Sequence, residues 1–244
     1  MPAAPRQFRP GRAATAVAAV ALVVLVALGV WQLQRREWKR ELIAGIEAQL
    51  QRPPLELVEA PREAGALDWR RVRLRAELLH ERSFALGAGA EGGRLGARLV
   101  TPARFGDGTL LLVDRGFVEE AELPPHLPPH KQPPGPVAIE GVARSLAALQ
   151  PSWFTPDDEP QRRRFWRLDP DALERFLGEA PLAVLVVAER AEPESVLGRV
   201  KPVKVELRDP HLGYALTWFG LAAALTAIYV HFGFARGRAA SEAS

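Results

Sequence analysis

One histidine and two aromatic residues open the apolar run near the C-terminus. His211, Tyr214 and Trp218 stand at i, i+3 and i+7, so on a helix they share one face. A neutral imidazole at the membrane boundary can ligate a haem iron, and aromatic rings can flank the porphyrin. The alternative is an aromatic belt at the membrane interface, with His211 as a polar boundary residue.

A second set of residues follows the apolar run near the N-terminus. Trp31, Arg35 and Trp38 at i, i+4 and i+7 form a corresponding helical face, and the two faces could oppose each other. The arginines after this run, or Arg208, could pair with haem propionates. His231 is excluded as a second ligand to the same iron, because 20 residues at about 1.5 Å rise place it some 30 Å from His211.

The amino-acid composition excludes several kinds of site. The chain has no cysteine, and its one methionine is Met1, which removes disulfides, thiolate metal sites, thiol nucleophiles and Cu(I) carriage. The 32 basic residues are interleaved with 29 acidic ones and form no basic stripe, so no nucleic-acid partner is expected. We find no G-x-S-x-G elbow, no phosphate-binding glycine loop and no H-E-x-x-H. No enzymatic activity is therefore predicted.

Both apolar runs are long enough to be transmembrane helices, over residues 13–34 and 211–234, since a bilayer requires about 20 apolar residues. For the first run the alternative is a cleaved secretory signal, which usually has a shorter apolar region. For the second it is a buried core helix, which an apolar character on all faces disfavours. The lipid bilayer is thus an expected partner.

The charged tails predict the orientation. Residues 1–12 carry three arginines and no acid, and residues 235–244 carry two arginines and one acid. Short positive tails stay in the cytoplasm, so we expect both tails to be cytoplasmic. The region 35–210 is then exported, into the periplasm if the protein lies in a bacterial inner membrane.

The region between the runs is predicted to be rich in β-strands. From Leu67 to Leu79 apolar residues alternate with charged ones, the period of a strand with one wet face. One short helix is expected between Asp169, an N-cap, and Gly178, a helix end. These elements predict a small barrel or sandwich. Further strands are expected over 98–105, 109–118, 136–144, 163–168, 182–189 and 200–207.

Three other segments are interpreted as non-catalytic. The proline-rich loop 123–136 contains His126 and His130, but its prolines forbid the helix that would place both on one face, so an exposed loop is expected. The glycines between residues 87 and 96 are assigned to turns. The acids at 157–159 adjoin the arginines at 162–164, which predicts a solvated ion-pair cluster.

Several blocks together resemble the Surfeit-one (Shy-one) family of cytochrome c oxidase assembly factors. LGVWQLQRREWKRELI (28–43) is similar to that family's G-x-W-Q-x-x-R-x-x-W-K signature, and HLGYALTWFGLA (211–222) to its H-x-x-Y-A-x-T-W-F block. The signature residues at the first membrane interface are Trp31, Gln32, Arg35, Trp38 and Lys39. Between them, RRVRLRAEL (70–78), LVTPARFGDGTLLLVDRGFV (99–118), IEGVAR (139–144) and FTPDDEPQRRRFWRLD (154–169) match further. Ala76 and Phe117 depart from the family's glycine and tryptophan.

The resemblance implies a non-catalytic factor that helps haem a reach subunit I of a terminal oxidase, with subunit I and haem a synthase as partners. It implies that His211 ligates or contacts the haem iron. Tyr214, Trp218 and Arg208 complete the expected haem-binding set. The rival hypothesis is a membrane scaffold that stabilises subunit I, or couples it to haem a synthase, without binding haem.

Overall fold

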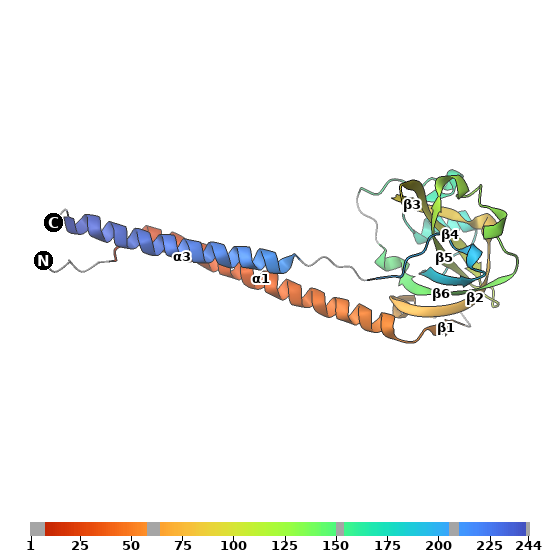
Figure 1. Ribbon diagram of the computed structural model, residues 1–244, viewed down its shortest axis with the longest axis horizontal. Helices are drawn as coiled ribbons and strands as arrows, with labels where there is room; N and C mark the ends of the chain where they lie inside the picture. Colours follow the sequence, from red (N-terminus) through yellow and green to blue (C-terminus); the bar gives the residue numbers. More distant parts are fainter. Residues whose placement is uncertain (1–7, 58–63, 150–153, 205–209, 243–244) are drawn as a thin grey trace. The chain divides into compact units, whose positions relative to one another are not determined.

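The computed structural model describes residues 8–57, 64–149, 154–204 and 210–242. They form two compact units, each described separately below (Figure 1). The helix pair consists of α1 up to Gly45 together with α3, and the sheet domain comprises the described residues from Ile46 to Lys204. In chain order the helices and strands are α1 (Arg12–Gln51), β1 (Leu55–Leu57), β2 (Arg70–Leu78), β3 (Phe84–Glu91), β4 (Arg94–Arg104), β5 (Leu110–Glu119), β6 (Pro136–Ser145), β7 (Arg164–Phe165), α2 (Pro170–Leu177), β8 (Val184–Glu192) and α3 (His211–Glu242).

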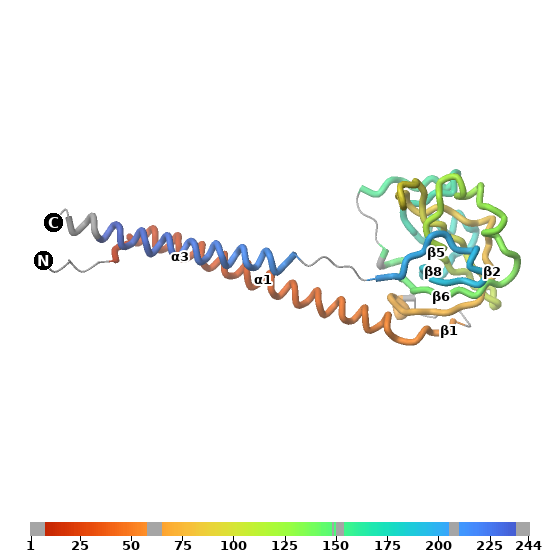
Figure 2. Tube along the Cα trace, viewed as in Figure 1, coloured from red at the N-terminus to blue at the C-terminus, as the bar shows by residue number. Residues whose placement is uncertain are grey.

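Five strands of the sheet domain close into a ring. The order β2-β6-β8-β5-β4 is completed by a pairing of β4 with β2, in which Glu77 and Leu78 face Arg104 and Ala103. Neighbours in the ring are antiparallel except β5 and β8, which run parallel. Figure 2 traces the chain through these strands. The predicted β-rich domain is confirmed, and the pairing is that of a barrel.

The interior of the ring is filled by the apolar residues that the alternation predicted. In β2, Val72, Leu74, Ala76 and Leu78 are all buried, while the residues between them are exposed. They pack with buried residues of the other strands, among them Ile139. Strand β2 thus has one face in the core and a charged outer face, as expected for a half-buried strand.

Helix α2 covers a second apolar cluster. The Asp169 carboxylate accepts a hydrogen bond from Ala172 N at 2.9 Å, and Gly178 ends the helix with φ of 77°; both ends are where the sequence predicted them. Leu173 and Leu177, one turn apart, are buried against the phenylalanines of β3 and β7.

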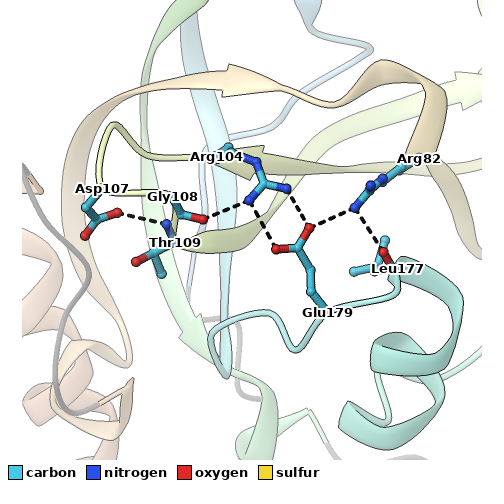
Figure 3. A network of polar contacts seen from close by, with 7 residues as sticks. All are labelled: Arg82, Arg104, Asp107, Gly108, Thr109, Leu177 and Glu179. Atoms are coloured by element: carbon cyan, nitrogen blue, oxygen red, sulfur yellow. Dashed lines mark hydrogen bonds and ion pairs between the residues drawn. The ribbon is translucent and has the colours of Figure 1, made fainter.

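A carboxylate just after α2 fixes this helix to the sheet (Figure 3). Glu179 accepts hydrogen bonds from Arg82 at 2.9 Å and from Arg104 at 2.5 Å. Arg82 also donates to Leu177 O, and Arg104 to Gly108 O, both at 2.9 Å. The hydrogen bond from Arg104, and then that from Arg82, lowers the pKa of Glu179 below its ordinary value.

Two sequence predictions about local structure differ from what is found. Gly92 and Gly93 form the turn of the β3–β4 hairpin, as predicted, but the other glycines between residues 87 and 96 lie in its strands, where Gly89 pairs with Gly96. A Cβ on Gly96 would lie 2.0 Å from Val118 O, so this glycine allows a close cross-strand approach. Residues 200–204 form no strand, and the rest of the predicted strand, 205–207, lies outside the described residues.

The proline-rich loop packs against the domain instead of projecting from it. Leu123 and Leu127 are buried, and the carbonyl of Lys131 accepts a hydrogen bond from Arg115. His126 and His130 are exposed. The prediction of an exposed loop is correct for both histidines and wrong for the two leucines, which are spaced between the prolines and belong to an apolar cluster with residues of β3, β4 and β5.

The predicted ion-pair cluster is confirmed in part of the acidic segment. Glu159 pairs with Arg162 at 3.2 Å, and Asp157 with Arg167 at 3.1 Å. The strand expected over 163–168 is shorter, limited to β7. Asp158 instead accepts hydrogen bonds from the backbone N–H groups that follow β7, so this carboxylate has a structural role.

The two long helices are apolar, and most of their described residues are exposed. Residues Arg12–Gln51 and His211–Gly237 are long and apolar enough to cross a membrane. Both helices extend past the apolar runs, to Gln51 and Glu242. Apolar side chains that remain outside a protein core are those expected to face lipid.

Candidate functional site

A glycine allows α1 and α3 to approach closely. Gly29 is buried, and a Cβ added there would lie 2.6 Å from the ring of Phe219. Towards the chain ends, the hydroxyl groups of Thr15 and Tyr229 are 2.8 Å apart. The helices are therefore antiparallel neighbours, which brings the end of the first apolar run to the start of the second. Small residues play this role in helix packing within membranes.

Above this contact, a histidine of α3 meets a glutamine of α1. His211 Nδ1 lies 2.8 Å from Gln32 Oε1. An amide oxygen only accepts hydrogen bonds, so Nδ1 is the donor in this contact, and a neutral imidazole in this arrangement has its lone pair on Nε2. Histidines that ligate metals are commonly oriented in this way, by a hydrogen bond from the other ring nitrogen. The arrangement therefore suits a metal ligand.

The aromatic residues predicted for this region lie on accessible surface of the helix pair. Tyr214 is 56% exposed, Trp31 is 54% exposed, and Trp218 is half-buried. The guanidinium of Arg35 stacks on the ring of Trp38 at 4.0 Å. Flat aromatic surfaces beside a cation can bind an apolar ligand that also carries an anionic group.

Among the described residues, the others predicted for the site are not found beside His211 and Gln32. Lys39 is half-buried, and Arg208 lies outside the described residues. His231 is exposed on α3, twenty positions after His211. In the described part of the chain, no group of three or more His, Asp or Glu side chains could hold a metal ion, so a metal centre made only of protein ligands is not found there.

The pairing of His211 with Gln32 was not predicted from the sequence, although both residues were singled out. The predicted opposing face on α1 was Trp31, Arg35 and Trp38, whereas Gln32 lies opposite His211. A signal was available, because Gln32 ends one apolar run and His211 opens the other. In an antiparallel hairpin these two positions lie at the same depth.

Family comparison then identifies the chain. Residues 19–223 match the model of the SURF1 family. The chain belongs to the SURF1 family. The resemblance inferred from the sequence blocks is thereby confirmed, and the matched range includes both Gln32 and His211 of this SURF1-family chain.

Curated relatives extend over most of this SURF1-family chain. The mouse protein named Surfeit locus protein 1 is 31% identical over 217 residues, which cover 83% of this chain and 70% of the mouse protein. The human protein of the same name is 32% identical over 218 residues, covering 83% and 71% respectively. A SURF1-like protein of Monosiga brevicollis is 30% identical over 215 residues, covering 83% and 81%.

Proposed function

We propose that this SURF1-family protein is a non-catalytic assembly factor for a haem-a-containing cytochrome c oxidase. In this proposal it binds haem a at the Gln32–His211 end of the helix pair and transfers it to subunit I. Haem a is the cargo and not a resident cofactor. The observation that carries the proposal is the 2.8 Å contact between His211 Nδ1 and Gln32 Oε1.

His211 is the proposed iron ligand. In the neutral imidazole, a hydrogen bond from Nδ1 to Gln32 leaves the lone pair on Nε2, the nitrogen proposed to ligate the iron. Loss of a residue that orients a metal-ligating histidine typically weakens metal binding about 10- to 100-fold. Gln32 is accordingly a positioning residue, and His211 is the ligand.

The neighbouring side chains match the two-sided chemistry of the cargo. Haem a has an apolar ring and an isoprenoid tail, which favour hydrocarbon, and propionates, which favour water and cations. Tyr214 and Trp31 offer exposed aromatic surface, and Trp218 stands on the same helical face as His211 by its spacing. Arg35, stacked on Trp38, and Arg208 are the proposed partners of the propionates.

The proposal places the helix pair in the cell's inner membrane, with both tails in the cytoplasm and the sheet domain in the periplasm. The support is the length of the two apolar helices and the arginine-rich tails. Subunit I of the oxidase and haem a synthase are the proposed partners, because a carrier must receive its cargo from the enzyme that makes it.

A second candidate function is a scaffold that stabilises subunit I, or couples it to haem a synthase, without binding haem. The same contact also fits this alternative, since a hydrogen bond between a histidine and a glutamine can hold two membrane helices together. The two functions differ in whether the purified protein carries haem a.

The test is the absorption spectrum of the full-length protein, purified in detergent from cells that make haem a. The wild type should show a haem a band, His211→Ala should lose it, and Gln32→Leu should retain a weakened band. His231→Ala is the matched control, because it removes an exposed histidine from the same helix and should leave the band unchanged.

Two results would count against the haem-carrier proposal. A band of equal intensity in His211→Ala and wild type would mean that the ligand lies elsewhere. No band in any variant, wild type included, would favour the scaffold. Protease resistance of the sheet domain, measured on each sample, separates loss of haem from loss of folding.

A further inference from the structure

The sheet domain contains a cavity of about 680 Å³. Part of its lining is apolar and includes Leu168 and Leu185, which are buried, and the half-buried Val187. Lys201, Val203 and Lys204 also line it. Cavities that bind small ligands typically have about 300–1,000 Å³ and a mostly apolar lining with a few polar groups.

One wall of the cavity is held rigidly by a tryptophan and an arginine. The guanidinium of Arg144 lies 3.6 Å from the ring centre of Trp69. Trp69 has φ of 63°, a left-handed conformation that is uncommon for a bulky residue. Asp68 accepts hydrogen bonds from Arg144 Nε at 3.0 Å and from Ser145 N at 2.9 Å. Such a strained, well-supported residue is typical of binding sites.

The charged residues of the lining are mostly cationic. Among the described residues the lining includes one carboxylate, that of Asp114, which is 3% exposed and already hydrogen-bonded to Arg98 and Gly116 N. Most of the cations also have acidic partners outside the lining, but no ion pair of Lys204 is found in the described part of the chain. The cationic lining residues are Arg98, Arg144, Arg167, Lys201 and Lys204.

Two hydrogen-bond donors of the lining residues lack acceptors. Trp166 Nε1 and Arg167 Nε are buried and have no partner within the described part of the structure. A buried donor without an acceptor costs about 1–3 kcal/mol, so each such group calls for an explanation. Since both atoms are buried, a ligand oxygen would supply the missing acceptor only after these side chains turn towards the cavity.

We propose that this cavity binds a small ligand with an apolar body and an anionic oxygen group, either a carboxylate or a phosphate. The apolar lining residues and the indole rings would contact the body, and the cationic lining residues would contact the anion. This goes beyond the proposed haem transfer, because the cavity shares no residue with the Gln32–His211 site. The two proposals can therefore fail independently.

The test uses the full-length protein in lipid nanodiscs and isothermal titration, with empty nanodiscs as the reference. The probes are 2-naphthoate, 2-naphthyl phosphate and the neutral naphthalene-2-carboxamide. At least one anionic probe should bind ten-fold or more tightly than the amide. Whichever anion binds better identifies the source of the charge as a carboxylate or a phosphate.

Variants assign binding to the cavity. Lys204→Glu should weaken binding of the anion at least ten-fold, and Val203→Trp should abolish it by filling the space while leaving the charge unchanged. Arg175→Glu is the matched control, since it reverses an exposed charge of α2 outside the lining and should have no effect. His211→Ala should also bind the probe as wild type does.

The proposal is overturned if the amide binds as tightly as both anions. It is equally overturned if Lys204→Glu and Val203→Trp both bind the anion with wild-type affinity, because binding then occurs elsewhere.

Discussion

Replacing Gly116 by alanine should destabilise the sheet domain strongly. Gly116 lies in β5 with φ of 95°, where an added Cβ would stand 2.6 Å from Arg199 O and 2.8 Å from Val200 Cγ1. The backbone carbonyl cannot rotate away as the end of a side chain can. The substitution must therefore displace the segment that contains Arg199.

The magnitude has two parts. A left-handed conformation costs a non-glycine residue about 1–2 kcal/mol. Displacement of the segment breaks the hydrogen bonds Phe117 N→Arg199 O at 2.9 Å and Arg199 N→Phe117 O at 2.8 Å, at about 1 kcal/mol each. We expect Gly116→Ala to lower the free energy of unfolding by about 3–4 kcal/mol, a large share of the roughly 5–15 kcal/mol of an ordinary domain.

Substitutions of two other glycines distinguish the conformational cost from the cost of the displaced segment. Gly87 has φ of 71° with open space around its Cβ position, so Gly87→Ala should cost only the conformational part. Gly106 has neither feature, so Gly106→Ala should be close to neutral. If Gly116→Ala is no more destabilising than Gly87→Ala, the contact with Arg199 does not have the cost assigned to it.

Thiol labelling in a urea series measures this on the full chain. The protein has no cysteine, so a single Ala103→Cys, at a fully buried site of β4, reports unfolding of the sheet domain alone. The label should react at lower urea concentration in the Gly116→Ala background than in the other two.

Three further predictions concern charged groups of the sheet domain, each measured with the same thiol label. Glu179→Gln should be destabilising at neutral pH and lose its effect in acid. Arg104 and Arg82 lower the pKa of Glu179 in the folded state, so the stabilisation by its carboxylate is present above the ordinary pKa and disappears as pH falls through the folded-state pKa. Burial, together with the charge of Arg115, lowers the pKa of His80 below 6.5. The free energy of unfolding should therefore decrease as pH falls below about 6.5. His80→Gln should flatten that decrease, whereas an unchanged slope would contradict the assignment. Arg115→Met should lower the free energy of unfolding by about 1–3 kcal/mol, because buried acceptors lose their hydrogen bonds. This loss exceeds the gain from no longer burying the guanidinium, whose burial lowers the pKa of Arg115 to about 10.

The sequence predicted elements whose signal is local. The alternation in β2 and the capping residues of α2 each specify an element within a few residues, and both were confirmed. The two apolar helices were likewise evident from composition, although the sequence alone underestimated their length.

The elements that were missed depend on distant parts of the chain. Strand β3 has the glycines of a turn but is held by its partner β4, and the proline-rich loop is packed by contacts with distant residues such as Arg115. The buried Arg115 is held by carbonyl and hydroxyl oxygens, with no carboxylate partner among the described residues, and it could not be distinguished in sequence from the many exposed arginines. In the candidate site, residue types and spacing pointed to His211, while Gln32 as its partner required the helix register.

The close approach at Gly29 also determines how the helices can move. Phe219 of α3 fills the space that a Cβ at position 29 of α1 would occupy, which fixes the alignment of the two helices along their axes. The nearest alternative alignment for packed helices is a slide of one turn, about 5.4 Å. Such a slide would separate His211 from Gln32, whose contact is 2.8 Å, and free the imidazole to change which nitrogen carries the proton. In the proposed haem transfer, such an axial translation would let the cargo leave His211 without separation or unfolding of the helices, and a bulkier residue at position 29 would bias it.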